Sequence, residues 1–304
     1  FPEAVIELVK EGTLPISRVN EACSKILMAK FKLGLFENRF VDIEKIPENI
    51  FTPEHKFTAL ETARKGIVLL KNSNLLPLNK VKKSKKILVT GPNANNQSIL
   101  GDWHAAQPDE NVTTIFEGIK DLGESKGYDV SFFDSGDNIR KISNKNIQTT
   151  LDASKDADYV IVVVGDNSMR YKWKDKTAGE NMARAELNLA GKQLELVRSL
   201  KEINNNVIVV YVNGKPISEP WIQNNIPSII EAWEPGNLGG KAVAEIIFGD
   251  IEPHKFFCNK SSRAYLPPGT LSGLPSAMRF TFGLDSSPRL PISQTKSSRP
   301  IKTS

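Results

Sequence analysis

Apolar runs rich in β-branched residues recur along the chain and predict the strands of a sheet. The longest run, Tyr159 to Val164, has no polar interruption and predicts a strand that is buried on both faces. Shorter runs predict further strands at Ile67 to Leu70, Lys86 to Thr90, Val130 to Phe133, Val207 to Val212 and Ser228 to Ala232.

Between these runs, the apolar residues are spaced three and four apart, as on one face of a helix. This spacing predicts helices at Pro53 to Lys65, Thr113 to Leu122, Lys145 to Ser154, Leu187 to Ile203 and Leu238 to Phe248. Strands that alternate with helices favour an α/β fold. We expect a mostly parallel sheet flanked by helices on both faces, a three-layer α/β/α sandwich over residues 54–250.

The two ends of the chain differ from this central domain. Residues 1–36 have helical periodicity with an apolar stripe, on which Cys23 is expected to be a buried small residue. Residues 37–53 are rich in Asn, Pro and charge and are expected to form a linker. Residues 251–304 hold ten serines and seven prolines and show neither period, so we expect a poorly ordered tail.

Composition and charge exclude several classes of partner. The net charge of +5 comes from the tail, which has eight Lys or Arg against two acidic residues, so the rest of the chain is nearly neutral. We therefore expect no nucleic-acid partner. No apolar run approaches the roughly 20 residues that span a bilayer, so no membrane is expected. The three histidines are scattered without metal-ligand spacing, and we expect no metal or other cofactor.

Three polar loops follow predicted strands at one end of the sheet, where open α/β sheets bind ligands. They are residues 91–103, 165–184 and 231–240. Glu180 in the second loop is the candidate catalytic acid. Trp103 and Trp173 offer flat apolar faces, and aromatic platforms beside a carboxylic acid suit a sugar ring.

Each candidate has a structural alternative. Glu180 could be a solvated loop residue, and Trp103 could cap the core. Arg170 could be a solvated charge rather than a ligand clamp. Trp233 follows an apolar strand, so it could pack in the core or contact substrate.

The glycine-rich turn at residues 236–241 raises nucleotide binding as a different alternative. Its spacing is one residue short of a P-loop, and Ala242 stands where a Mg²⁺-binding hydroxyl would be needed. Nucleotide binding is therefore the weaker hypothesis.

Several motifs in a fixed order carry a family resemblance. They are Glu61 to Asn72, Leu76-Pro77-Leu78, Ile87 to Pro92, Gly101-Asp102-Trp103, Gly179-Glu180 with Arg184, Ala232 to Gly236 with Gly239-Gly240, and Val243 to Asp250. The series resembles the C-terminal domain of glycoside hydrolase family 3, and is most similar to bacterial β-glucosidases. Lys30 to Phe36 resembles the end of the last helix of the β/α barrel that precedes this domain in the family, and the whole resemblance runs from Phe1 to about Pro253.

The resemblance implies retaining hydrolysis of β-linked glucosides or oligosaccharides. Glu180 matches the general acid/base, and Trp103, Trp173, Arg170 and Arg184 are the expected substrate-binding residues. The family's nucleophile is an aspartate of the barrel, so the missing N-terminal barrel domain is the implied partner. We expect the chain alone to be inactive, with a non-catalytic carbohydrate-binding or partner module as the alternative function. A periplasmic or secreted location is also implied.

Two departures from the family pattern stand out. Ala183 precedes Arg184 where the family often has Asp, which puts a salt bridge of this loop in doubt. After Pro253 the family would continue with a Gly-x-Leu-Pro segment and a fibronectin-like module, and this chain does not. A shifted reading frame near Pro253 is a hypothesis that the nucleotide sequence would test.

Overall fold

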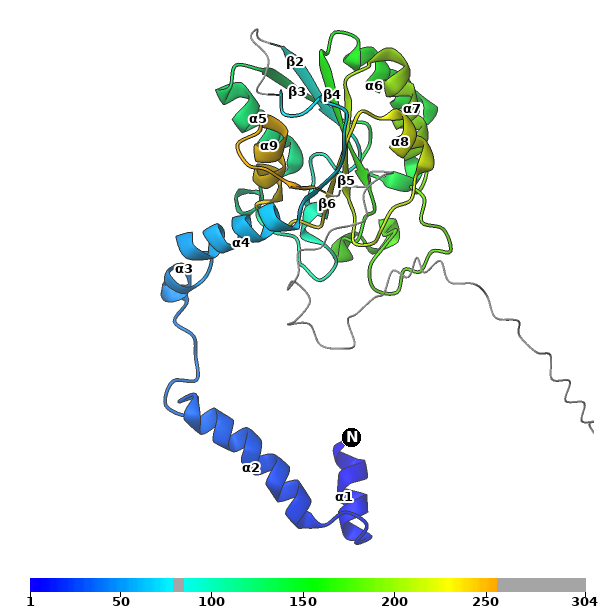
Figure 1. Ribbon diagram of the computed structural model, residues 1–304. Helices are drawn as coiled ribbons and strands as arrows, with labels where there is room; N and C mark the ends of the chain where they lie inside the picture. The colour runs from blue at the N-terminus through cyan, green and yellow to red at the C-terminus, as the bar shows by residue number, and fades with distance from the viewer. Residues whose placement is uncertain (79–84, 256–304) are drawn as a thin grey trace, which may run out of the picture. The chain divides into compact units, whose positions relative to one another are not determined.

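A sheet of seven strands organises the part of the chain that the computed structural model describes, residues 1–78 and 85–255. The strand order is β3-β2-β4-β5-β6-β1-β7 (Figure 1). Strands β3, β2, β4, β5 and β6 run parallel, whereas β1 is antiparallel to β6. The bounds are β1 Val68–Asn72, β2 Lys86–Thr90, β3 Asp129–Phe133, β4 Tyr159–Gly165, β5 Val207–Val212, β6 Ser228–Trp233 and β7 His254–Lys255.

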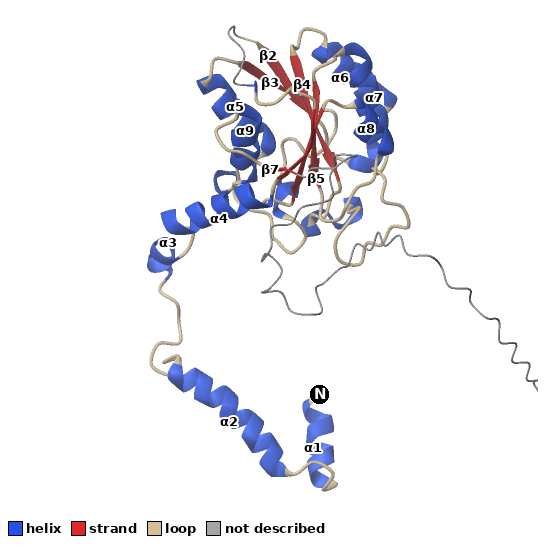
Figure 2. Cartoon of the chain, in the orientation of Figure 1, coloured by secondary structure: helices blue, strands red, loops and turns tan. Residues whose placement is uncertain are grey.

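Helices cover both faces of this sheet (Figure 2). Every residue of β4 and β5 is buried between them. One apolar core contains residues of α4, α5 and α9, and the other contains residues of α6, α7 and α8. The predicted three-layer sandwich is confirmed. The helix bounds are α4 Pro53–Gly66, α5 Ile115–Ser125, α6 Asn144–Ser154, α7 Gln193–Ile203, α8 Pro220–Asn225 and α9 Gly239–Phe248.

The predicted helix at Leu187 to Ile203 is too long at its start, because α7 begins only at Gln193. Gly191 has φ +64°, and a Cβ there would lie 2.2 Å from the carbonyl oxygen of Ile139. The Gln193 side chain bonds the backbone N–H and C=O of Gly165. These contacts fix an irregular turn before α7, which periodicity alone does not reveal.

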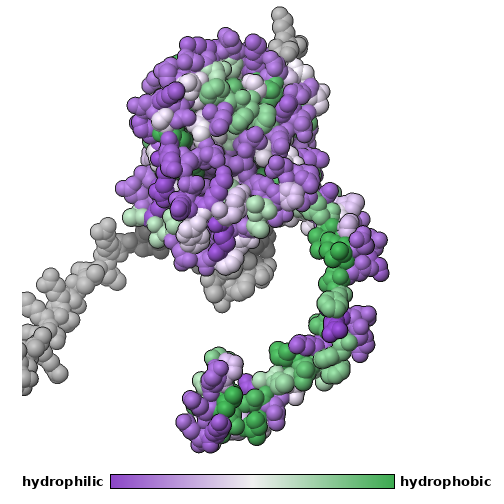
Figure 3. All heavy atoms as spheres, turned by 180° about the vertical axis from the view of Figure 1, so that it is seen from behind, coloured by the Kyte–Doolittle hydropathy of each residue, from purple (hydrophilic) through white to green (hydrophobic). Residues whose placement is uncertain are grey.

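The N-terminal region contains two helices, α1 Pro2–Lys10 and α2 Ile16–Lys32, neither of which has a buried residue. Apolar surface is exposed along these helices (Figure 3). The side chains of Ile26 and Phe31 on α2 are among the exposed ones. The prediction that Cys23 is buried is wrong, because this side chain is exposed. No described segment covers the apolar stripe that contains Cys23.

Residues 37–53, the predicted linker, contain a 3₁₀ turn and the short helix α3 Ile46–Asn49. Of the predicted tail, residues 251–255 are described, and β7 within them pairs in parallel with β1. Residues 256–304 lie outside the described part of the chain. Within the described residues, no helix combines the length and the apolar character that crossing a bilayer requires.

The strand order brings two of the predicted site loops together. The chain leaves β2 for the edge strand β3 and then returns to β4 on the other side of β2. Such a reversal opens a crevice at the carboxyl ends of the two inner strands. Residues 91–103 leave β2 there, and residues 166–184 leave β4.

Candidate functional site

Glu180 lies in the loop after β4 and is tied to the loop after β2 through its backbone. Its N–H donates to Oδ2 of Asp102 at 2.5 Å. Its side chain is 43% exposed. The two loops therefore meet at Glu180 and leave its carboxylate accessible.

Asp102 and Lys176 form the ion pair beneath this contact. Lys176 is fully buried, and its Nζ lies 2.7 Å from Oδ1 of Asp102. The same ammonium group donates to the carbonyl oxygen of Glu180 at 3.3 Å. Burial alone would raise the pKa of Asp102, but the hydrogen bonds from Lys176 and from the Glu180 amide outweigh burial and lower it. Both backbone groups of Glu180 thus rest on one buried ion pair.

Gly179 allows the backbone to approach Asp102 this closely. It has φ +89°, and a Cβ at this position would lie 2.6 Å from Oδ2 of Asp102. Only glycine fits such a conformation and such a contact without displacing the neighbouring residue. The Gly179-Glu180 pair noted in the sequence is therefore a geometric requirement of the site.

Arg170 links the carboxylate of Glu180 to the aromatic side chains. Its guanidinium carbon lies 3.6 Å from the centre of the Trp103 ring and 5.7 Å from that of Trp173. Its Nη2 is ion-paired with Oε2 of Glu180, and its Nε lies 3.7 Å from Oδ1 of Asp102. Such stacking of a guanidinium on an indole is favourable. Four of the five predicted site residues thus lie in one cluster.

The exposed fractions of the tryptophans decide whether these residues pack in the core. The Trp103 residue is 76% exposed, so it does not cap the core, and Trp173 is 45% exposed. Trp233 is 38% exposed at the end of β6, so it is not a core residue either. All three indoles are accessible to a ligand.

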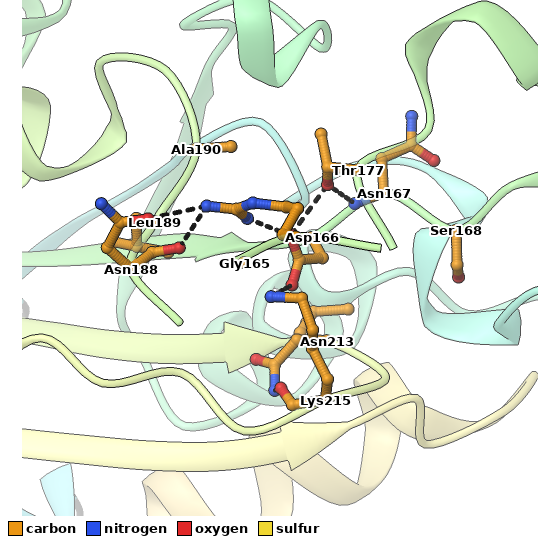
Figure 4. A network of polar contacts seen from close by, with 12 residues as sticks. Gly165, Asp166, Asn167, Ser168, Thr177, Asn188, Leu189, Ala190, Asn213 and Lys215 are labelled. Carbon is orange, nitrogen blue, oxygen red and sulfur yellow. Dashed lines mark hydrogen bonds and ion pairs between the residues drawn. The ribbon is translucent and has the colours of Figure 1, made fainter. Parts of the chain in front are cut away.

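The guanidinium group of Arg184, the fifth predicted site residue, is bonded to other residues of this chain. Its Nη1 lies 3.0 Å from Oδ1 of Asp166, and its Nη2 donates to the carbonyl oxygen of Asn188 at 2.7 Å. Asp166 is buried, and its Oδ2 forms an ion pair with Nζ of Lys215 at 2.8 Å (Figure 4). The angles of this contact are not those of a hydrogen bond. The loop does contain a salt bridge of Arg184 although Ala183 precedes it.

Glu234 is a further candidate site residue, which the sequence pattern did not single out. Its carboxylate accepts a hydrogen bond from the Ser168 hydroxyl, and a Cβ on Gly101 would lie 2.7 Å from its Oε2. Burial raises the pKa of Glu234, and the hydrogen bond from Ser168 opposes part of that rise. Glu234 therefore contacts the loops after β2 and β4 from the loop after β6. The signal in the sequence was an acidic residue between an apolar strand and Pro235-Gly236.

Among residues 1–78 and 85–255, no three His, Cys, Asp or Glu side chains are grouped so as to hold a metal ion.

Residues 67–255 match the family model described as "Glycosyl hydrolase family 3 C-terminal domain". The chain belongs to glycoside hydrolase family 3. It is 38% identical over 250 residues to a β-xylosidase of Formosa agariphila, covering 77% of this chain and 32% of that protein. It is 29% identical over 271 residues to a periplasmic β-glucosidase of Salmonella typhimurium, covering 81% of this chain and 34% of the relative.

Solved structures agree on the fold of this family 3 chain. A β-glucosidase from Listeria innocua in complex with isofagomine superposes with a TM-score of 0.68 at 24% identity. The superposition covers 82% of this chain and 33% of the other. The chain therefore spans about a third of the length of the family 3 proteins that it matches. The resemblance predicted from the motifs is confirmed.

Proposed function

We propose that this family 3 chain supplies the general acid/base, Glu180, and part of the sugar cleft of a retaining β-glycosidase. β-Glucosides and β-xylosides are the candidate substrates, because the named relatives include a β-xylosidase and a β-glucosidase. One observation carries the proposal: the partly exposed carboxylate of Glu180 and the ring of the exposed Trp103 both contact Arg170, at the crevice between β2 and β4.

In this reaction, Glu180 first donates a proton to the glycosidic oxygen and later removes one from the attacking water. Its two backbone contacts, to Asp102 and Lys176, fix the residue, while its side chain is partly exposed. Arg170 covers the Trp103 ring and holds one oxygen of Glu180. Most of the Trp103 residue nevertheless stays exposed, so a sugar that stacks on its free side lies beside the Arg170–Glu180 pair.

Retention also requires a nucleophilic carboxylate about 5–5.5 Å from the acid. Asp102 is the carboxylate nearest in the hydrogen-bond network, but Lys176 occupies Oδ1 and the Glu180 amide occupies Oδ2. We assign the nucleophile to the part of the relatives' length that this chain does not span. The proposal therefore predicts no turnover by the 304-residue chain alone.

The N-terminal helices fit this proposal as the place where the two parts join. Residues 1–36 expose an apolar stripe, and buried apolar area is what stabilises most association. We propose that residues 1–36 pack against the preceding barrel and that residues 37–53 link it to the sandwich of residues 54–250.

The test is hydrolysis of an aryl β-glucoside and an aryl β-xyloside by two proteins. One is this chain, and the other is this chain fused behind the N-terminal two thirds of the Formosa agariphila β-xylosidase. We expect activity only in the fusion, with Glu180→Gln abolishing most of it and Glu186→Gln, an exposed loop glutamate, leaving it unchanged. Hydrolysis by the chain alone would overturn the assignment of the nucleophile.

A second candidate function is carbohydrate binding without hydrolysis. It is favoured by the exposed indoles of Trp103 and Trp173, both of which contact Arg170. To test for carbohydrate binding, the chain is titrated with xylobiose or cellobiose while its tryptophan fluorescence is measured. If the chain binds either sugar and the fusion shows no hydrolysis, this function is favoured over hydrolysis.

A further inference from the structure

Glu231 is a buried carboxyl group at the end of β6 that the proposed chemistry does not use. The residue is 5% exposed. Its Oε1 accepts the backbone N–H of Trp233 at 3.0 Å, and its Oε2 faces Nδ2 of Asn213 at 3.4 Å. In the described part of the chain, it forms no ion pair with a Lys, Arg or His. The titratable group that faces it from β5 is the phenol of Tyr211, which in turn faces Glu219.

The backbone that Glu231 contacts has an unusual conformation. Trp233 has φ +58°, which is rare for any residue other than glycine, asparagine or aspartate. The register of β5 against β6 shifts here, because Tyr211 pairs with Glu231 but Val212 pairs with Trp233. The N–H of Asn213 donates to the carbonyl oxygen of Trp233 at 3.0 Å. Both backbone groups of Trp233 are thus bonded, one to Glu231 and one to Asn213.

The residues that follow Trp233 join the three loops of the site. Glu234 contacts Ser168 and fills the space beside Gly101. Gly236 donates its N–H to the carbonyl oxygen of Ile99 at 2.8 Å, just before the segment that carries Trp103. A change in the direction of the chain at Trp233 would therefore move a contact of both other loops.

We propose that Glu231 is a positioning residue: its carboxyl group holds Trp233 in the left-handed conformation, and this conformation directs Glu234 against the loops that carry Trp103 and Arg170. The positioning stands on contacts within this chain. Its catalytic consequence rests on the function proposed above.

The ionisation of Glu231 adds a pH dependence to this role. Burial raises its pKa to about 7, with the hydrogen bonds from Trp233 and Asn213 opposing the rise. An ionised carboxylate is a stronger acceptor than a protonated one. The hydrogen bond to the Trp233 amide therefore strengthens as the pH rises through neutrality.

The first test needs no enzyme activity and uses the ¹⁵N-labelled chain. The amide signals of Trp233 should shift with pH with a midpoint near 7. This titration should disappear in Glu231→Gln, which keeps an acceptor but cannot ionise. In Glu231→Leu, which removes the acceptor, amide exchange at Trp233 should be roughly tenfold faster.

The matched control is Glu245→Gln, which alters another buried glutamate, paired with Arg64 between α9 and α4. It should leave the Trp233 titration intact. A Trp233 amide that does not titrate near pH 7, or that still titrates in Glu231→Gln, would overturn the positioning role.

The second test measures the pH profile of hydrolysis by the fusion described above. Glu231→Gln should remove an inflection near pH 7 from kcat while changing KM little. If Trp233 titrates as expected but no fusion hydrolyses glycosides, the proposed function fails and the positioning stands. If the fusion is active and its pH profile is the same in Glu231→Gln, the catalytic consequence is overturned.

Discussion

The amide nitrogen of Glu180 lies 2.5 Å from a carboxylate oxygen of Asp102, although the two residues are 78 positions apart. Because Lys176 holds the other oxygen of Asp102 from a fully buried position, the contact is anchored in the protein interior. The backbone of the candidate acid is therefore fixed by tertiary contacts, whereas its side chain is partly exposed. This division suits a residue that must be placed accurately and still reach a ligand.

Replacing Lys176 by methionine should destabilise the domain strongly. The substitution removes the buried cation of the Asp102 carboxylate and leaves only Arg170, whose Nε lies 3.7 Å away. Removing one partner of a buried pair typically costs about 3 kcal/mol or more, and Arg170 should offset part of this cost. Urea unfolding measures the change. The control is Lys192→Met, which breaks an exposed pair with Glu195 and should change stability by less than about 1 kcal/mol. Equal effects of the two substitutions would contradict the anchoring role of Lys176.

Replacing Gly179 by alanine should perturb the site more than backbone strain alone explains. Gly127 provides the control, because its φ of +85° is similar but a Cβ added to it would have no atom within 4 Å. A Cβ added to Gly179 would lie 2.6 Å from Oδ2 of Asp102. Gly127→Ala should cost about 1 kcal/mol from strain. Gly179→Ala should cost more and should also shift the NMR signal of the Glu180 amide. An unshifted Glu180 amide would contradict the close approach.

The effect of Glu180→Gln on the active fusion should depend on the leaving group. With a leaving group of high pKa, loss of general acid catalysis should lower the glycosylation rate by roughly 10²- to 10⁴-fold. With 2,4-dinitrophenolate, which needs no protonation to depart, the loss should be much smaller. Steady-state and burst kinetics with a series of aryl glycosides measure this dependence. A loss that is equal across the series would assign Glu180 a role other than proton transfer.

Glu231 should make stability depend on pH in a defined direction. Its pKa in the folded chain, about 7, exceeds its ordinary value of 4.5, so the folded state binds the proton more tightly than the unfolded state. Its contribution is therefore fully present below pH 4.5 and is lost as the pH rises through 7. Relative to Glu231→Gln, the free energy of unfolding should fall by on the order of 3 kcal/mol over that interval. Denaturant unfolding at several pH values measures it, and parallel curves for the two proteins would refute the shifted pKa.

The sequence determined the layers of the domain because these depend on local patterns. The apolar run from Tyr159 to Val164 predicted a strand covered on both faces, and the alternation of strands and helices favoured a mostly parallel sheet. The order of the family motifs identified the family for the same reason, since each motif is a local segment. Gly179 and Glu180 were also visible, as a glycine and an acid in a loop after a central strand.

Only the tertiary structure decided which side chains meet at the site. The burial of Lys176 under Asp102, the stacking of Arg170 on Trp103 and the place of Glu234 depend on how the loops after β2, β4 and β6 converge. A lysine between Asp175 and Thr177 reads as a solvated charge in the sequence, because nothing local shows the carboxylate that compensates its burial. The strand order sets these contacts across long separations, so they follow from packing and not from the pattern of any one segment.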